Sequence, residues 1–213
     1  MPLIEEVKLG VGVCGDDLYA FAGVLKERGE FLEALFVYKL AYQDFIERRD
    51  AMGITNCIIR MPSRLLAVKN EDFITKSIVV QYTGTVQEAM RFIDGKHISH
   101  EEKINYKAKC LDSIGRLFCG LGFYSDAIRK YDEGIELMRK SIPNPDQFNV
   151  YGGCFNNKGS ALKLLGKYMD SLACYKFGLI SHKKAIDFPN DQVRDGNIKQ
   201  VEKNINMVKS LMK

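Results

Sequence analysis

The chain has 213 residues, of which 46% are hydrophobic and 27% are charged, and its formal net charge is +4. These values exclude a disordered or fibrous chain, and the length suffices for one domain or one short repeat array with its own core. No run approaches the roughly 18 uninterrupted apolar residues that a membrane-spanning helix needs. Glu5 and Glu6 lie where a secretory signal would carry basic residues, so we expect an intracellular, cytoplasmic protein without a membrane partner.

The first motif along the chain is a cluster of three glycines near the amino terminus. Gly10, Gly12 and Gly15 form a literal G-x-G-x-x-G in LGVGVCG. That pattern binds a dinucleotide only when it joins a strand to a helix within a βαβ unit. The residues that follow have helical spacing and no second strand is indicated downstream, so we predict no dinucleotide and no other cofactor.

The first predicted unit covers residues 15–50. Leu18, Ala22 and Leu25 recur at steps of four and three, as on one face of a helix. Gly29 then supplies a permissive turn. The segment RGEFLEALFVYKLA places small and aromatic residues at steps of three, four and three: Phe31, Ala34, Tyr38 and Ala41. Two helices joined by a short turn form an antiparallel hairpin.

The second unit, residues 54–95, follows the same pattern less closely. Phe73 takes the aromatic position, but Glu71 stands in place of the turn glycine and Lys76 in place of the small residue. Pro62 leaves the register open, because a proline is expected to begin a helix instead of lying inside one.

The third and fourth units, residues 105–142 and 150–187, repeat most clearly. LGFYSDAIRKYDEG and LGKYMDSLACYKFG share one spacing but few residues, and their turn glycines are Gly122 and Gly166. Such a pattern indicates one packing arrangement used repeatedly.

Small residues recur inside these hairpins. Gly115 and Gly159 lie in the first helix of each unit and allow close backbone approach, while Tyr131 and Tyr175 of the second helix fill the adjacent space. A Tyr at this position could stack on nucleic-acid bases, but its spacing favours burial in the core.

The last predicted element is a single helix over residues 191–212. The linkers before it and before the fourth unit contain Asp191 and Asp146, which we expect to cap the helices that follow. One apolar stripe runs along the helix: Ile198, Val201, Ile205 and Val208. A helix with one apolar face is what a repeat array needs to cover its open end.

These features together resemble the tetratricopeptide repeat family. Ile114-Gly115, the Gly122-x-Tyr124 turn, Ala127 and Tyr131 match the family pattern best. The turn glycines are 44 residues apart, compared with the family's usual 34, and this longer period resembles the extended-helix branch of the family. No unit has the family's Trp. The resemblance implies an all-α fold: a right-handed superhelical array of about four antiparallel hairpins and a capping helix.

No pattern indicates catalysis or metal binding. The six cysteines are scattered and are expected to be free thiols. His97 and His100 have no third ligand nearby, so we predict no metal site. No nucleophile, base and orienting group occur together, so we predict a noncatalytic protein.

The family resemblance implies a groove lined by the first helix of each unit. The residues of that face are Tyr19 and Lys26, Met61 and Leu65, Lys109, Asp112 and Arg116, and Asn156, Asn157, Ser160 and Lys163. They do not reproduce the family's carboxylate clamp, so binding of chaperone tails is not predicted. An ordinary solvated surface is the alternative.

The predicted function is an adaptor or scaffold that binds a partner peptide or helix, with acidic or amide groups over the basic residues. An alternative is a scaffold associated with RNA or a ribonucleoprotein, because residues 151–213 contain eleven basic and five acidic residues. We consider nucleic acid the less favoured partner.

Overall fold

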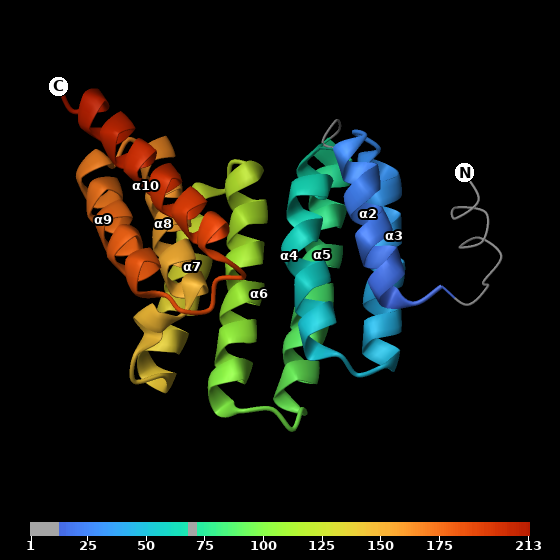
Figure 1. Ribbon diagram of the computed structural model, residues 1–213. Coiled ribbons are helices and arrows are strands. Elements are labelled where there is room, and N and C mark those ends of the chain that lie inside the picture. Colours follow the sequence, from blue (N-terminus) through green and yellow to red (C-terminus); the bar gives the residue numbers. More distant parts are fainter. Residues whose placement is uncertain (1–12, 68–71) are drawn as a thin grey trace. The chain divides into compact units, whose positions relative to one another are not determined.

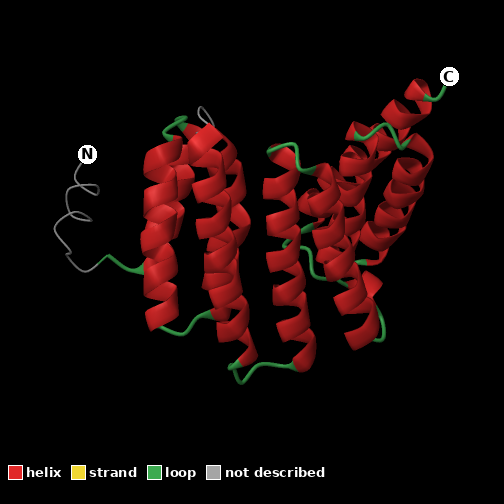
Figure 2. Ribbon diagram, turned by 180° about the vertical axis from the view of Figure 1, so that it is seen from behind, coloured by secondary structure: helices red, strands yellow, loops and turns green. Residues whose placement is uncertain are grey.

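The computed structural model describes residues 13–67 and 72–213, and these residues form nine α-helices, one short 3-10 helix and no strand (Figures 1 and 2). The all-α class is thereby confirmed, while the handedness of the array stays a prediction. The chain divides into two compact units, Met1–Phe92 and Ile93–Lys213. No described helix is both long enough and apolar enough to cross a membrane.

The first unit contains α2, α3, α4 and most of α5. Their bounds are Gly15–Glu27, Phe31–Glu47, Ala51–Ala67 and Asp72–Asp94. Helices α2 and α3 form a hairpin, and α4 packs against both. Ala22 and Tyr38 are buried in this hairpin, as the repeated small and aromatic positions predict. Gly10 and Gly12 lie outside the described residues, whereas Gly15 is the first residue of α2.

The second unit contains two hairpins and a final helix. Its helices are α6 (His100–Gly120), α7 (Tyr124–Ser141), the 3-10 helix η1 (Pro145–Gln147), α8 (Asn149–Leu164), α9 (Tyr168–Lys184) and α10 (Asp191–Leu211). Helix α8 packs against α6 and α7, and α10 packs against α9 and α8. The first helices of the two hairpins and the final helix, α6, α8 and α10, are therefore successive neighbours (Figure 1).

The hairpin turns share one backbone conformation. Gly29, Gly122 and Gly166 have φ values of 79°, 87° and 74°, which L-residues with a side chain rarely adopt. In the second of these turns, Phe123 N donates to Phe118 O and Gly122 N to Cys119 O. This pair of bonds is the Schellman motif, which satisfies the last carbonyls of a helix.

The turn between α3 and α4 uses the same conformation without glycine. Arg49 has a φ of 59°. Asp50 follows it, and its carboxylate accepts hydrogen bonds from the backbone N–H groups of Met52 and Gly53, both at 3.0 Å. Asp50 therefore caps α4, and the left-handed Arg49 carries a conformational strain of about 1 kcal/mol or more.

Pro62 lies inside α4, contrary to the expectation that it begins a helix. A proline has no N–H, so the carbonyl of Ile58, four residues earlier, loses its helical donor. The Tyr82 hydroxyl of α5 donates to that carbonyl at 2.9 Å. This long-range bond satisfies the acceptor and allows α4 to continue through the proline.

Close helix packing in the second unit depends on the predicted glycines. A Cβ atom at Gly115 would lie 2.4 Å from the Tyr131 ring, and one at Gly159 would lie 2.9 Å from the Tyr175 ring. Both rings are fully buried. The sequence pattern therefore predicted these two contacts correctly.

The helix caps differ from expectation in two places. Asn190, not Asp191, caps α10, and its side chain accepts from Val193 N at 2.9 Å. Asp146 forms an ion pair with Lys184. The amino end of α8 is instead satisfied by Asp187, which follows α9 and accepts from Asn149 N at 2.5 Å. Long-range packing, not the nearest Asp, determines these caps.

Candidate functional site

The predicted groove residues of the second unit gather on α6 and α8. This polar face consists of Lys109, Asp112, Arg116, Asn156, Asn157, Ser160 and Lys163, all of them partly buried. The structure therefore places these seven residues on two adjacent helices, and their role in a binding groove stays a prediction.

Asp112 is at the centre of the polar face. The Asn157 side-chain amide donates to its carboxylate at 2.8 Å across the α6–α8 contact. Burial raises the pKa of the Asp112 carboxyl, while the charge of Arg116 and the bonds from Asn157 and Cys154 act in the opposite direction. Arg116 and Asn157 therefore stabilise a carboxylate inside the helix contact, which is a structural role.

The α8 part of the polar face is in contact with α10. Asn204 Nδ2 donates to Asn156 Oδ1 at 3.1 Å, and Lys163 Nζ lies 3.3 Å from the Met207 sulfur. Ser160 shares a hydrogen bond of 3.0 Å with the hydroxyl of buried Tyr175. The chain's own last helix thus occupies positions that were predicted to meet a partner.

Lys109 lies about one turn before Asp112 on α6, with Nζ 5.6 Å from the centre of the Tyr106 ring. Burial lowers the pKa of the Lys109 ammonium, while the charge of Asp187 opposes this effect. The cation is held against its own chain by an aromatic ring, an arrangement worth about 0.5–1 kcal/mol at exposed sites.

The predicted residues of the first unit separate into two places. Tyr19 stacks edge-on against Tyr38 with ring centres 5.5 Å apart, and its hydroxyl accepts from Arg60 Nε of α4 at 3.3 Å. Lys26, the next-to-last residue of α2, forms an ion pair with Glu27. Met61 and Leu65 do not lie with Tyr19 and Lys26.

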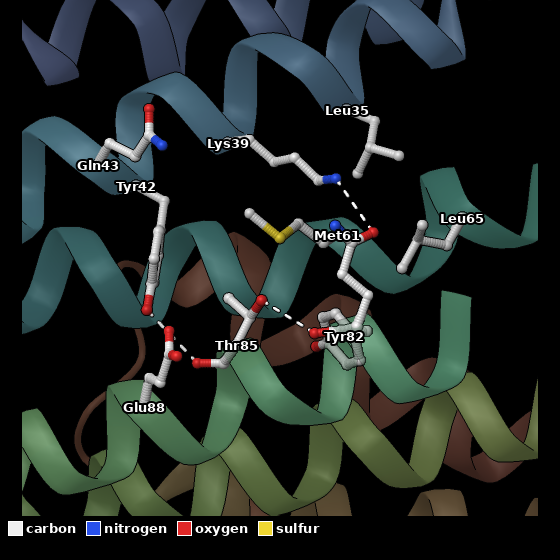
Figure 3. Close-up of a pocket in the computed structure, with 10 residues that line it drawn as sticks. Leu35, Lys39, Tyr42, Gln43, Met61, Leu65, Tyr82, Thr85 and Glu88 are labelled. Carbon is white, nitrogen blue, oxygen red and sulfur yellow. Dashed lines mark hydrogen bonds between the residues drawn. The ribbon is translucent and has the colours of Figure 1, made fainter. Parts of the chain in front are cut away.

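Met61 and Leu65 instead line a cavity among α3, α4 and α5, which we call the α3–α4–α5 cavity (Figure 3). Arg60, which reaches Tyr19, precedes Met61 by one position, and one residue turns a helix by about 100°. The register that Pro62 left open in the sequence is thus one in which Arg60 reaches Tyr19 and Met61 and Leu65 line the cavity.

The cavity has a volume of about 220 Å³. Its lining residues are Leu35, Lys39, Tyr42, Gln43, Met61, Leu65, Gln81, Tyr82, Thr85 and Glu88. Met61 and Leu65 are themselves 2% and 8% exposed, so they form an apolar wall. Lys39, Gln43, Gln81 and Glu88 are exposed and give the cavity a polar rim.

Three hydrogen bonds hold the walls in place (Figure 3). Lys39 Nζ donates to Gln81 Oε1 at 3.5 Å, Tyr42 donates to the Thr85 carbonyl at 3.4 Å, and Thr85 Oγ1 donates to the Gln81 carbonyl at 3.0 Å. The first two join α3 to α5. The long distance from Lys39 to Gln81 leaves both groups able to reorient toward a ligand.

Sequence reasoning did not identify the α3 and α5 walls of this cavity. Leu35 occupies a position of α3 between the repeated Ala34 and Tyr38, and it carries no motif of its own. A usable signal was the run of apolar residues on several sides of α3, including Leu32 and Phe36, which are 59% and 53% exposed. A helix that is apolar beyond one stripe has more than one neighbour or an uncovered face.

Comparisons with known proteins agree with the fold. No protein-family model and no curated protein sequence matches the chain. The crystal structure of the apo form of RapI matches with a TM-score of 0.57 and 13% identity, over 99% of this chain and 53% of RapI. BtubC from P. vanneervenii matches with a TM-score of 0.56 and 12% identity, over 92% of this chain and 79% of BtubC. The chain therefore spans about half the length of RapI, and the likeness shows a helical-repeat fold.

Proposed function

We propose that this chain is a noncatalytic interaction module of the tetratricopeptide repeat type, which binds a segment of a partner protein as an adaptor or scaffold. Three features support the family: the repeated glycine turns in one conformation, the repeated small residues packed under buried tyrosines, and a single final helix over the last hairpin. The six free cysteines support a reducing compartment, the cytoplasm, and cell fractionation tests this placement.

The observation that carries the proposal is the α3–α4–α5 cavity. Small-molecule and cofactor sites usually measure about 300–1,000 Å³. This cavity, at about 220 Å³, is smaller, and it has an apolar wall below a polar rim. Its size and chemistry fit one apolar side chain of a partner, with the partner's backbone lying across the rim.

The rim determines which partner groups lie beside that anchor. Lys39, Gln43 and Gln81 offer side-chain donors for peptide carbonyls, amide groups or a carboxylate. We therefore assign the partner segment an apolar anchor flanked by amide or acidic groups. A binding role for Tyr19, Lys26, Lys109 and Arg116 stays a prediction, whereas Asn156 and Lys163 primarily hold α10.

Site-specific photocrosslinking in the native cells tests this function. A benzoylphenylalanine in place of Gln43 lies on the rim, and the same group in place of Glu47, one turn farther along α3, is the matched control. We expect a crosslinked partner from position 43, and mass spectrometry of its peptides should place an apolar residue beside the crosslink.

A second pair of variants tests whether the cavity itself binds the partner. Leu35→Trp fills the cavity, while Leu32→Trp adds the same ring to an exposed position of the same helix. The crosslink at position 43 should disappear with Leu35→Trp and persist with Leu32→Trp, with circular dichroism confirming that both variants fold. A crosslink that survives Leu35→Trp would contradict the proposal.

A further inference from the structure

Helix α9 has an apolar outer face that no described part of the chain covers. Met169, Phe177 and Ile180 are 69%, 58% and 53% exposed, and exposed Ala173 lies between them. These positions, at steps of four, four and three, form one stripe along the helix, which we call the α9 outer face. A shallow hollow of about 290 Å³ runs along it.

The repeat itself provides an internal control for this face. The equivalent positions of α7, 44 residues earlier, are Ser125, Arg129, Glu133 and Glu136. Arg129 pairs there with Asp126 and Glu133, as expected of a solvated helix face. The fold therefore does not require apolar residues at these positions, and their presence on α9 needs another explanation.

Packing within the chain does not explain the apolar residues of the α9 outer face. Helix α10 covers the adjoining side of α9, where its Val201, Ile205 and Val208 pack around Tyr175. Leu172 lies at the border, packed against this cluster and also lining the hollow. Phe177 stacks on Phe155 of α8 with ring centres 5.5 Å apart, which fixes its ring while the outer surface stays exposed. The α9 outer face is thus a firm apolar surface, and contiguous exposed patches of this kind mark interaction sites.

The charges around this face are positive. Helix α9 contains Lys176, Lys183 and Lys184 but one acidic residue, Asp170. Lys184 pairs with Asp146, whereas within residues 13–67 and 72–213 neither Lys176 nor Lys183 lies within ion-pair distance of a carboxylate. A partner with acidic groups beside its apolar surface would complement them.

We propose that the α9 outer face docks an amphipathic helix of a partner protein, with an apolar stripe and acidic flanks. The stripe from Met169 to Ile180 extends over about 17 Å, which matches about three turns of a partner helix. This surface belongs to Ile93–Lys213 and the α3–α4–α5 cavity to Met1–Phe92, so variants can test the two separately.

A displayed library of 16-residue helices tests this inference on the full chain. Leu is fixed along one stripe, and the flanking positions vary among Glu, Gln, Ser and Lys. Binders are selected on the wild type and counter-selected on Met169→Glu/Ile180→Glu. We expect enrichment of Glu at the flanks, and peptides with two Glu flanks should bind about two to thirty times more tightly than their Lys versions.

Controls identify the surface and the occupant. Met169→Glu/Ile180→Glu should weaken a selected peptide at least about tenfold, because it places carboxylates against the peptide's apolar stripe. Ser125→Glu, at the α7 position equivalent to Met169, should leave the affinity unchanged. Failure to enrich any binder, or equal enrichment of Lys and Glu, would overturn the proposal. Two other outcomes would also overturn the proposal. One is a dimer, seen by sedimentation, that Met169→Glu/Ile180→Glu abolishes. The other is binding to phosphatidylserine vesicles that the same variant abolishes.

Discussion

Gly115 offers a sharp test of the hairpin packing. A Cβ at this position would lie 2.4, 2.8 and 2.8 Å from three atoms of the Tyr131 ring. That ring is 1% exposed and packs with Ala127 and Ala161, so it has little room to move. Gly115→Ala gains about 1 kcal/mol of helix propensity, but forcing extra volume into a packed core costs about 1–3 kcal/mol. We expect a net loss of up to about 2 kcal/mol.

A double-mutant cycle separates the clash from the propensity. In a Tyr131→Leu background the ring is absent, so Gly115→Ala should become stabilising by about 0.5–1 kcal/mol. Gly153→Ala is the matched control, because apart from the adjacent residues and the backbone of its own helix no atom lies within 4 Å of the added Cβ, and it should stabilise by a similar amount. Urea unfolding followed by circular dichroism measures each change. If Gly115→Ala stabilised the wild type as much as Gly153→Ala does, the proposed packing of Gly115 against Tyr131 would be refuted.

Four further predictions follow from the structure. Arg49→Gly should stabilise the chain by about 0.5–1 kcal/mol in urea unfolding, because glycine adopts the left-handed turn without strain; a destabilised variant would argue against that conformation. Burial lowers the pKa of His182, whose Nδ1 has no hydrogen-bond partner among the described residues. The unfolded state therefore binds the proton first, so stability should fall as pH drops below about 6.5, and His182→Leu should flatten that dependence in thermal melts. Deletion of residues 191–213 should uncover the surface around Tyr175, lower the melting temperature and cause aggregation visible by light scattering; an unchanged, monomeric product would mean that α10 is dispensable. Binding to single-stranded RNA at 150 mM salt should be no tighter than the nonspecific range of about 10⁻⁴–10⁻⁶ M, and a tighter complex with a steep salt dependence would favour the RNA alternative.

The sequence predicted the hairpins well because their determinants are local. The turn glycines, the small residues at Gly115 and Gly159, and the buried tyrosines all recur at fixed helical steps. Each such feature depends only on residues that are near in the sequence or on the adjoining helix of the same hairpin. The pattern therefore carries over to the structure with little change.

The sequence predicted less where distant groups decide the structure. Pro62 continues a helix because Tyr82, from another helix, donates to the carbonyl that the proline leaves without a donor. Likewise Asn149 is satisfied by Asp187, which lies 38 residues away. Spacing alone could not reveal either bond, since neither partner belongs to a local motif.

The candidate site was predicted only in part for a similar reason. Met61 and Leu65 were selected as binding residues, but the other walls of their cavity come from α3 and α5. The apolar residues of the α9 outer face are evident in the sequence, but helical spacing does not distinguish a buried face from an exposed one. Distinguishing them requires knowing which neighbours pack on each side.

The most direct test of the proposed function is a methyl NMR titration of the full chain labelled at its methionines. N-acetyl-leucine methylamide is the probe, and N-acetyl-glycine methylamide is the control without a side chain. The Met61 methyl signal should shift and saturate with the leucine probe alone, while that of Met52, exposed on the same helix, stays in place. Leu35→Trp should abolish the shift. A Met61 signal that does not move, or that moves equally with the glycine probe, would contradict an apolar anchor site in the α3–α4–α5 cavity.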